Sequence, residues 1–160
     1  VRCAIDGDTF SAADCLGDGE VFRMLGIDTP ELAKDSEPAD CFANEAWLEL
    51  AAILENERVT LTFDDTCTDI YDRTLAYVWL YGEEAEDLID ADRDDQFDNP
   101  EEESEEPVVL VNEWMLAKGF ARVYDSADAP LADLLLGERL QSAENRAKNS
   151  ELGLWGQCSD

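Results

Sequence analysis

The 160-residue sequence contains no histidine and three lysines. The missing histidines exclude histidine-activated serine or cysteine nucleophiles, histidine-ligated zinc sites and histidine general bases. Proton transfer near neutral pH therefore falls to carboxylates, tyrosine, lysine or a metal-bound water. The scarcity of lysine leaves 11 basic residues against 40 acidic ones, a formal net charge of −29. By charge alone, a polyanionic partner is unfavourable.

Long apolar runs and CxxC motifs are also missing. No run approaches the roughly 20 residues that span a bilayer, so no membrane-spanning segment is expected. The chain opens on strand-like sequence, which predicts no leader peptide, with a processed chain as the alternative. The five widely spaced cysteines fit two disulfides and one free thiol, which favours a secreted, periplasmic or cell-surface protein over a cytosolic one with buried thiols. Their pairing does not follow from sequence, and they are Cys3, Cys15, Cys41, Cys67 and Cys158.

The acidic residues are partly concentrated in one segment. Residues 83–106 hold 14 acids and one base, with too few apolar positions to build a core. We expect a flexible insertion within a single domain that spans residues 1–160, because the spaced pattern of an EF-hand calcium loop is missing. The acidic, lysine-poor surface suits high salt, where the Debye length is about 3 Å at 1 M. A calcium-rich or merely solubilising surface is the alternative.

Hydrophobic spacing predicts an α+β protein rich in strands. A meander of short strands followed by a second strand pair indicates a small closed barrel with helices packed on it. The predicted elements are three strands within residues 1–27, a helix over 44–55, strands over 58–63 and 73–81, a helix that begins at Asn112 and ends at Gly119, an extended segment over 120–124 and a last helix from Pro130.

One stretch places a charge where an apolar side chain is expected. In VFRMLGIDTPE, residues 21–31, Arg23 lies within a strand-like apolar run that ends at Asp28 and Glu31. A buried, unpaired charge costs on the order of several kcal/mol. Arg23 must therefore face an anion, and without substrate the neighbouring carboxylates or bound water would have to satisfy it.

The acids and arginines of three segments together fit phosphodiester hydrolysis. Asp8 and Asp28 can supply hard oxygen ligands for Ca²⁺ or Mg²⁺, with a backbone carbonyl near Thr29 as a third. Glu31 follows closely enough to orient or deprotonate a water. Each motif alone is an ordinary turn or loop. The planar guanidinium groups suited to phosphate oxygens belong to Arg23 and Arg73.

The order of the motifs resembles one family. AIDGDTF, VFRMLGIDTPE, YDRTLAYV, VNEWMLAKGFARVY and LGLW follow one another as in staphylococcal-nuclease-like (thermonuclease) domains, from residue 1 to about residue 156. The resemblance implies a five-stranded OB-fold barrel with three packed helices. It also implies a Ca²⁺-dependent endonuclease that acts on DNA and RNA and leaves 3′-phosphate ends. We expect a monomer with no obligate protein partner.

The resemblance also assigns roles to single residues. Two positions depart from the family pattern: Ile70 stands where lysine is common, and Asp72 stands where glycine is common. A non-catalytic OB-type binding module, with or without bound calcium, is the alternative function, and an acidic interaction domain is a third. The implied roles are calcium ligation by Asp8, Asp28 and the Thr29 carbonyl, phosphate binding by Arg23 and Arg73, water activation by Glu31, a place beside a substrate phosphate for Tyr71 and one near the metal for Asp6.

Overall fold

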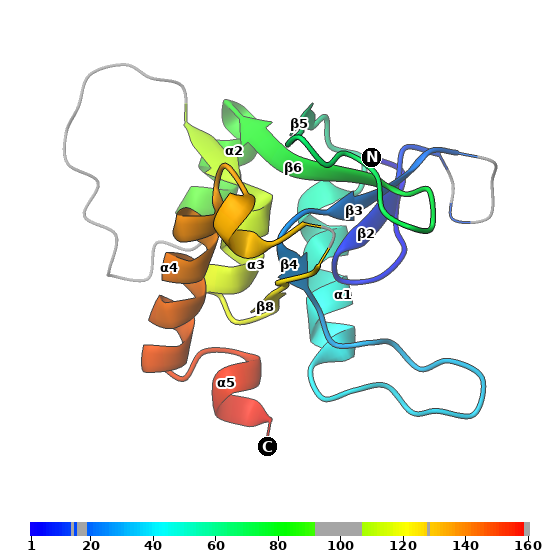
Figure 1. Cartoon of the computed structure of the whole chain (residues 1–160). Coiled ribbons are helices and arrows are strands. Elements are labelled where there is room, and N and C mark those ends of the chain that lie inside the picture. The colour runs from blue at the N-terminus through cyan, green and yellow to red at the C-terminus, as the bar shows by residue number, and fades with distance from the viewer. Residues whose placement is uncertain (14, 16–18, 92–106, 128, 159–160) are drawn as a thin grey trace.

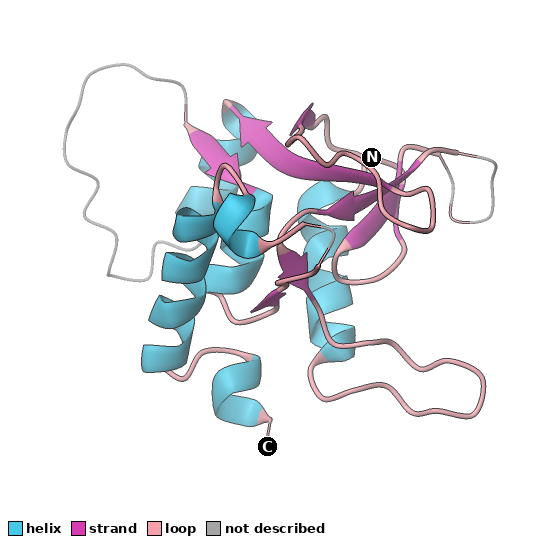
Figure 2. Ribbon diagram, viewed as in Figure 1, coloured by secondary structure: helices cyan, strands magenta, loops and turns pink. Residues whose placement is uncertain are grey.

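A curled mixed β-sheet with helices packed against it forms the body of the protein (Figures 1 and 2). The structure is a computed structural model that describes residues 1–13, 15, 19–91, 107–127 and 129–158. Within these residues the sheet order is β1-β2-β3-β6-β5, with β7 also paired to β6, and β4 pairs separately with β8. The strands are β1 (Cys3–Ala4), β2 (Thr9–Ser11), β3 (Val21–Met24), β4 (Ile27–Asp28), β5 (Thr60–Thr62), β6 (Thr74–Tyr81), β7 (Val108–Leu110) and β8 (Arg122–Val123).

Strand β3 lies inside the sheet. It pairs antiparallel with β2 and parallel with β6, so that Arg23 lies opposite Thr9 on one side and Leu75 on the other. The rings of Phe10 and Phe22 stack with their centroids 5.4 Å apart. The apolar run that contains Arg23 is therefore a central strand, and this position buries the arginine.

The helices occupy the predicted regions and some additional ones. Helix α3 packs against α4 (Figure 1), and α1 packs against β1. The face of α1 that is buried carries Ala46, Leu50 and Ile53, which follow the helical spacing seen in the sequence. The helices of the described residues are α1 (Ala43–Leu54), α2 (Glu83–Ala91), α3 (Val111–Ala117), α4 (Gly137–Asn149) and α5 (Leu154–Gln157), with a 3₁₀ turn at Leu131–Asp133.

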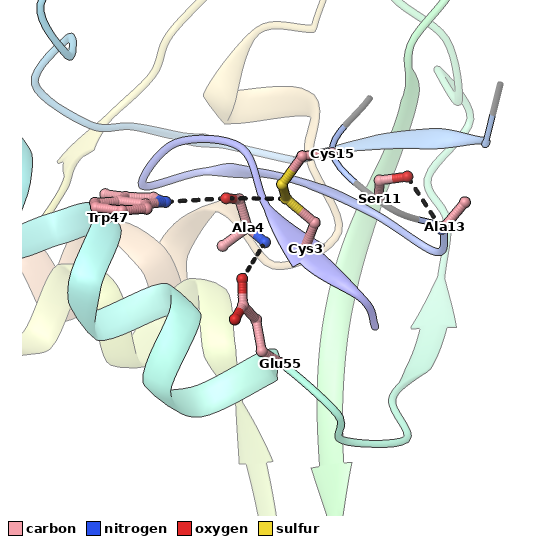
Figure 3. Close-up of a disulfide and its surroundings, with 7 residues drawn as sticks. All are labelled: Cys3, Ala4, Ser11, Ala13, Cys15, Trp47 and Glu55. Atoms are coloured by element: carbon pink, nitrogen blue, oxygen red, sulfur yellow. Dashed lines mark hydrogen bonds between the residues drawn. A yellow bond between two sulfur atoms is a disulfide. The ribbon is translucent and has the colours of Figure 1, made fainter. Parts of the chain in front are cut away.

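A disulfide and two hydrogen bonds to the α1 region hold the short first strand in place (Figure 3). Cys3 in β1 is bonded to Cys15. On the neighbouring residue, the Ala4 carbonyl accepts a hydrogen bond from Trp47 Nε1 at 2.9 Å, and the Ala4 N–H donates to Glu55 Oε1 at 3.0 Å. Two residues of strand are thus held by one covalent bond and two side chains of the helix region.

The prediction of two disulfides and one free thiol is confirmed. A second disulfide joins Cys41 to Cys158 across a sequence separation of 117, and Cys67 is an exposed free thiol. The predicted α+β class, with a barrel-type sheet that carries packed helices, is also confirmed. No helix in the described part of the chain is long and apolar enough to cross a membrane.

The prediction that residues 83–106 are flexible is wrong for the first nine of them, which form α2. Ala85 is fully buried, and its small side chain allows α2 to approach the sheet closely. Leu88, one turn further along α2, packs against the core. The remaining residues, 92–106, lie outside the described residues.

Two helix boundaries also differ from the prediction. The last helix begins at Gly137, after a 3₁₀ turn that follows Pro130. Asn112 is inside α3 rather than at its cap, and it is completely buried. Its side chain accepts the Val78 N–H at 2.8 Å and donates to the carbonyls of Leu25 and Ala76 at 2.9 and 3.3 Å. Asn112 therefore ties α3 to the sheet through backbone groups that would otherwise be buried without a partner.

Candidate active site

Seven of the eight predicted site residues line one cleft of about 290 Å³. They come from the β1–β2 turn, from β3, from β4 and the segment after it, and from the loop before β6. The pairing of β2 with β3 and of β3 with β6 brings these segments together. The eighth residue, Thr29, is buried beside the cleft against Asp8. The seven are Asp6, Asp8, Arg23, Asp28, Glu31, Tyr71 and Arg73.

Arg23 is paired within the protein. Its side chain is 10% exposed; Nη2 lies 2.7 Å from Asp28 Oδ1, and Nη1 forms an ion pair with Asp8 Oδ2. The two carboxylates thus flank a single guanidinium, which compensates the buried charge. Burial raises the pKa of the Asp28 carboxyl, and the positive charge of Arg23 opposes that rise. Neighbouring carboxylates therefore pair with Arg23, as expected, and they are those of Asp8 and Asp28, the two predicted metal ligands.

Asp8 is held in place by hydroxyl and amide donors. The Thr29 N–H and Oγ1 donate to Asp8 Oδ2 at 2.8 and 2.9 Å, and Thr9 Oγ1 donates to Oδ1 at 3.0 Å. Thr29 therefore contacts Asp8 through its donors, and ligation by its carbonyl stays a prediction. Gly7 permits this close packing, because a Cβ there would lie 2.7 Å from Thr29 Oγ1 and 2.9 Å from the Ala46 Cβ.

Asp6 adds a third carboxylate to this group. Its Oδ1 accepts the Asp8 N–H at 3.1 Å. Burial, and next the negative charge of Asp8, raise the pKa of Asp6 to about 6. Asp6 and the two carboxylates that pair with Arg23 together leave an excess of negative charge in this part of the cleft, which fits a hard cation. No group of three acidic or cysteine side chains in the described residues is arranged to hold a metal, so carbonyl and water ligands would be needed as well.

We predict that Asp6→Asn stabilises the metal-free protein at pH 7.5 and has little effect below pH 4. Folding raises the pKa of Asp6 from its ordinary value of 3.8 to about 6, so ionisation of this carboxyl as the pH rises favours the unfolded chain. Asparagine retains the Oδ1 acceptor and removes the charge. Urea unfolding in EDTA at both pH values measures the effect. A stabilisation of the same size at pH 4 and 7.5 would contradict the assignment.

Arg73 is held by Asp69 in the loop before β6. Asp69 Oδ2 accepts Arg73 Nε at 2.7 Å, and the Arg73 guanidinium lies 5.5 Å from the centre of the Tyr71 ring. Tyr71 is 73% exposed at the mouth of the cleft. Asp72, which stands where glycine is common in the family, is exposed and has a positive φ of 60°. Sequence reasoning gave Asp69 no role, although its spacing of four residues from Arg73 was a usable signal.

Glu31 projects from an exposed loop at the edge of the cleft. Its backbone N–H donates to Asp40 Oδ2 at 3.2 Å, and its carbonyl accepts the Asp40 N–H at 2.9 Å. Asp40 precedes Cys41, which is bonded to Cys158. The loop that presents Glu31 is therefore tied to the C-terminal disulfide.

Sequence reasoning missed the segment that follows β8. Tyr124, Ser126 and Ala129 complete the wall of the cleft, and the Arg23 guanidinium lies 5.8 Å from the centre of the Tyr124 ring. Strand β8 reaches this position by pairing with β4, where Arg122 lies opposite Asp28. The available signal was the aromatic residue Tyr124 at the end of the extended segment predicted over 120–124.

Comparison with known proteins agrees with this geometry. The model of the family of staphylococcal nuclease homologues matches residues 21–157. The chain belongs to this family. The matched range contains Arg23, Asp28, Glu31 and Arg73, while Asp8 lies before it.

Among the relatives of this staphylococcal nuclease homologue are thermonucleases. The one from Staphylococcus intermedius is 43% identical over 80 residues, which cover 50% of this chain and 47% of that protein. The one from Staphylococcus hyicus is 43% identical over 76 residues, with coverages of 48% and 44%. A probable endonuclease, lcl3, of Botryotinia fuckeliana is 29% identical over 134 residues, with coverages of 83% and 41%. The chain thus spans less than half the length of each of these three relatives.

The cleft of this staphylococcal nuclease homologue is itself acidic. Five carboxylates and two guanidinium groups line it, which gives a formal charge of −3. Attraction of a polyanion by the empty cleft is therefore unfavourable, and a bound divalent cation would remove most of the excess charge. The five carboxylates are those of Asp6, Asp8, Asp28, Glu31 and Asp69.

Proposed function

We propose that this chain is a calcium-dependent endonuclease that hydrolyses phosphodiester bonds of DNA and RNA and leaves 3′-phosphate ends. The observation that supports it is the convergence of acids and two arginines in one cleft of a staphylococcal nuclease homologue. The domain would be a single one over residues 1–160. Two disulfides support a location outside the cytosol, on the cell surface, in the periplasm or secreted.

The donor set fits a calcium ion. Asp8 and Asp28 approach the same guanidinium, so they are close enough to share a cation, and the Thr29 carbonyl would add a third oxygen. When bound, the ion would supply positive charge for the phosphate and lower the pKa of a coordinated water. Asp6 would strengthen the negative field around the ion without ligating it.

The chain's own residues would do the remaining chemistry. Glu31 would hold the attacking water and accept its proton, because it lies at the open edge of the cleft. Arg23 and Arg73 would neutralise the charge that develops on the phosphate oxygens in the transition state. Tyr71, exposed beside Arg73, would contact a neighbouring phosphate of the substrate.

The test is cleavage of single-stranded DNA with Ca²⁺, Mg²⁺ or EDTA. We expect cleavage with Ca²⁺, none in EDTA, and a loss of about 10²-fold or more in kcat for Glu31→Gln, as for removal of a general base. Glu37→Gln, at an exposed position of the same loop, is the matched control and should cleave normally. The absence of Ca²⁺-dependent cleavage at every salt concentration would refute the proposed nuclease activity.

The net charge favours a second candidate, a non-catalytic OB-type binding module. A salt series separates the two functions. Repulsion between the chain and a polyanion is screened as salt rises, so a nuclease adapted to high salt should cleave faster towards about 1 M, opposite to the usual counterion-release trend. A binding module would show no cleavage at any salt.

A further inference from the structure

Asp69 uses all of its polar groups to build the loop that presents Tyr71 and Arg73. Its Oδ1 accepts the N–H groups of Tyr71 at 2.8 Å and Arg73 at 3.0 Å, and its Oδ2 accepts Arg73 Nε at 2.7 Å. Its backbone N–H donates to the Arg73 carbonyl, and its carbonyl accepts the Asp72 N–H, both at 3.1 Å. One residue thus closes the turn and also fixes the side chain of Arg73.

The two arginines of the cleft are held at different edges. Arg23 meets its carboxylates through its terminal nitrogens, Nη1 and Nη2. Arg73 meets Asp69 through Nε. A guanidinium has one Nε donor and four terminal donors. The pair with Asp69 therefore leaves the terminal edge of Arg73 for a phosphate, whereas the terminal edge of Arg23 already faces acids.

The carboxylate of Asp69 is suited to this contact. Burial acts to raise its pKa, but the backbone and side-chain hydrogen bonds from Arg73 outweigh burial and hold the pKa below its usual value. Asp69 is therefore ionised across the neutral range, and its contact with Nε is charge-assisted.

We propose that Asp69 is a positioning residue that orients the terminal edge of the Arg73 guanidinium towards the substrate phosphate. The inference rests on the proposed nuclease function. Asp69→Asn separates the two tasks of the residue. Asparagine keeps the Oδ1 acceptor for the turn but places its amide N–H₂ donor against the Arg73 Nε donor. The turn is then retained and the guanidinium loses its charged anchor.

A double-mutant cycle between Asp69 and Arg73 tests the proposal. A small misplacement of a catalytic group costs up to about 10²-fold in rate, so we expect Asp69→Asn to lower kcat about 10- to 100-fold and to raise KM by no more than about fivefold. Asp72→Asn removes one charge from the same loop, tolerates the positive φ and should change kcat less than about twofold. In an Arg73→Lys background, Asp69→Asn should add less than about twofold. An equal loss in both backgrounds, or a loss no larger than that of Asp72→Asn, would overturn the proposal.

A binding measurement separates this inference from the nuclease activity. In Glu31→Gln with Ca²⁺, Asp69→Asn should weaken the affinity for a single-stranded oligonucleotide about fivefold, and this loss should disappear with Arg73→Lys. If the wild-type chain binds but does not cleave, the proposed function fails, while the double-mutant cycle on affinity still decides whether Asp69 acts through Arg73. A chain that neither cleaves nor binds overturns both.

Discussion

Replacement of Cys41 and Cys158 by serine should lower the free energy of unfolding by about 4 to 5 kcal/mol. The disulfide joins residues separated by 117 positions, and in the chain-entropy account a loop of about 100 residues is worth roughly 4.7 kcal/mol. The Cα atoms lie 5.8 Å apart, so the bond forms without displacing the backbone. It fixes the end of α5 to the loop before α1.

Two matched variants make the measurement specific. The Cys3–Cys15 disulfide spans 12 positions, and its removal should cost about 3 kcal/mol, as expected of a short loop. Cys67→Ser changes an exposed free thiol and should alter stability by less than about 0.5 kcal/mol. Unfolding in guanidinium chloride measures all three. Equal losses for the two disulfides would contradict the dependence on loop length.

Replacement of Cys41 and Cys158 by serine should also lower the rate of cleavage. Asp40 contacts the backbone of Glu31 on both its amide and its carbonyl, and Cys41 is the next residue. Loss of the covalent anchor should therefore loosen the segment that presents Glu31. Thermal unfolding measured beside activity at 25 °C separates the two effects, because the folded fraction is known at the assay temperature.

Sequence reasoning selected residues that the fold brings into one cleft, but it did not predict how they pair. Arg23 in an apolar strand, with acids at the strand exit, predicted an internal or substrate anion. That both Asp8 and Asp28 contact its terminal nitrogens depends on the register of β2 against β3 and on the turn between β3 and β4. Tyr124 reaches the cleft through the β4–β8 pairing, which no local pattern encodes. Disulfide partners have the same dependence on tertiary structure.

The error at α2 has a physical reason. Its high negative charge and few apolar positions were interpreted as incompatible with packing. Glutamate, alanine and leucine are nevertheless good helix formers, and the acids in the first turn, Glu83, Glu84 and Glu86, interact favourably with the helix dipole. A helix that already forms well needs only a small buried contact, which Ala85 and Leu88 provide.

Arg23→Met should destabilise the metal-free protein by about 3 to 5 kcal/mol, because one partner of a buried ion-pair group is removed and its acids are left uncompensated. The side chain of Arg23 is 10% exposed and that of Asp8 is 7% exposed. Methionine fills similar volume, so the loss would report charge rather than a cavity. Unfolding in EDTA measures it. Arg122→Met, at an exposed arginine on β8, is the control and should cost about 1 kcal/mol or less.

Calcium should restore more stability to Arg23→Met than it adds to the wild-type chain. Without the guanidinium, Asp8 and Asp28 have no competing cation, so the ion binds more tightly and stabilises the folded state in proportion to RT ln(1 + [Ca²⁺]/Kd). The variant should still lose about 10²- to 10³-fold in kcat, since it lacks a donor to the transition state. Equal stabilisation of both chains by calcium would refute the assignment of Asp8 and Asp28 as calcium ligands. Stability recovered without activity would mean that the acids of this cleft bind the cation without Arg23, whereas cleavage requires the guanidinium.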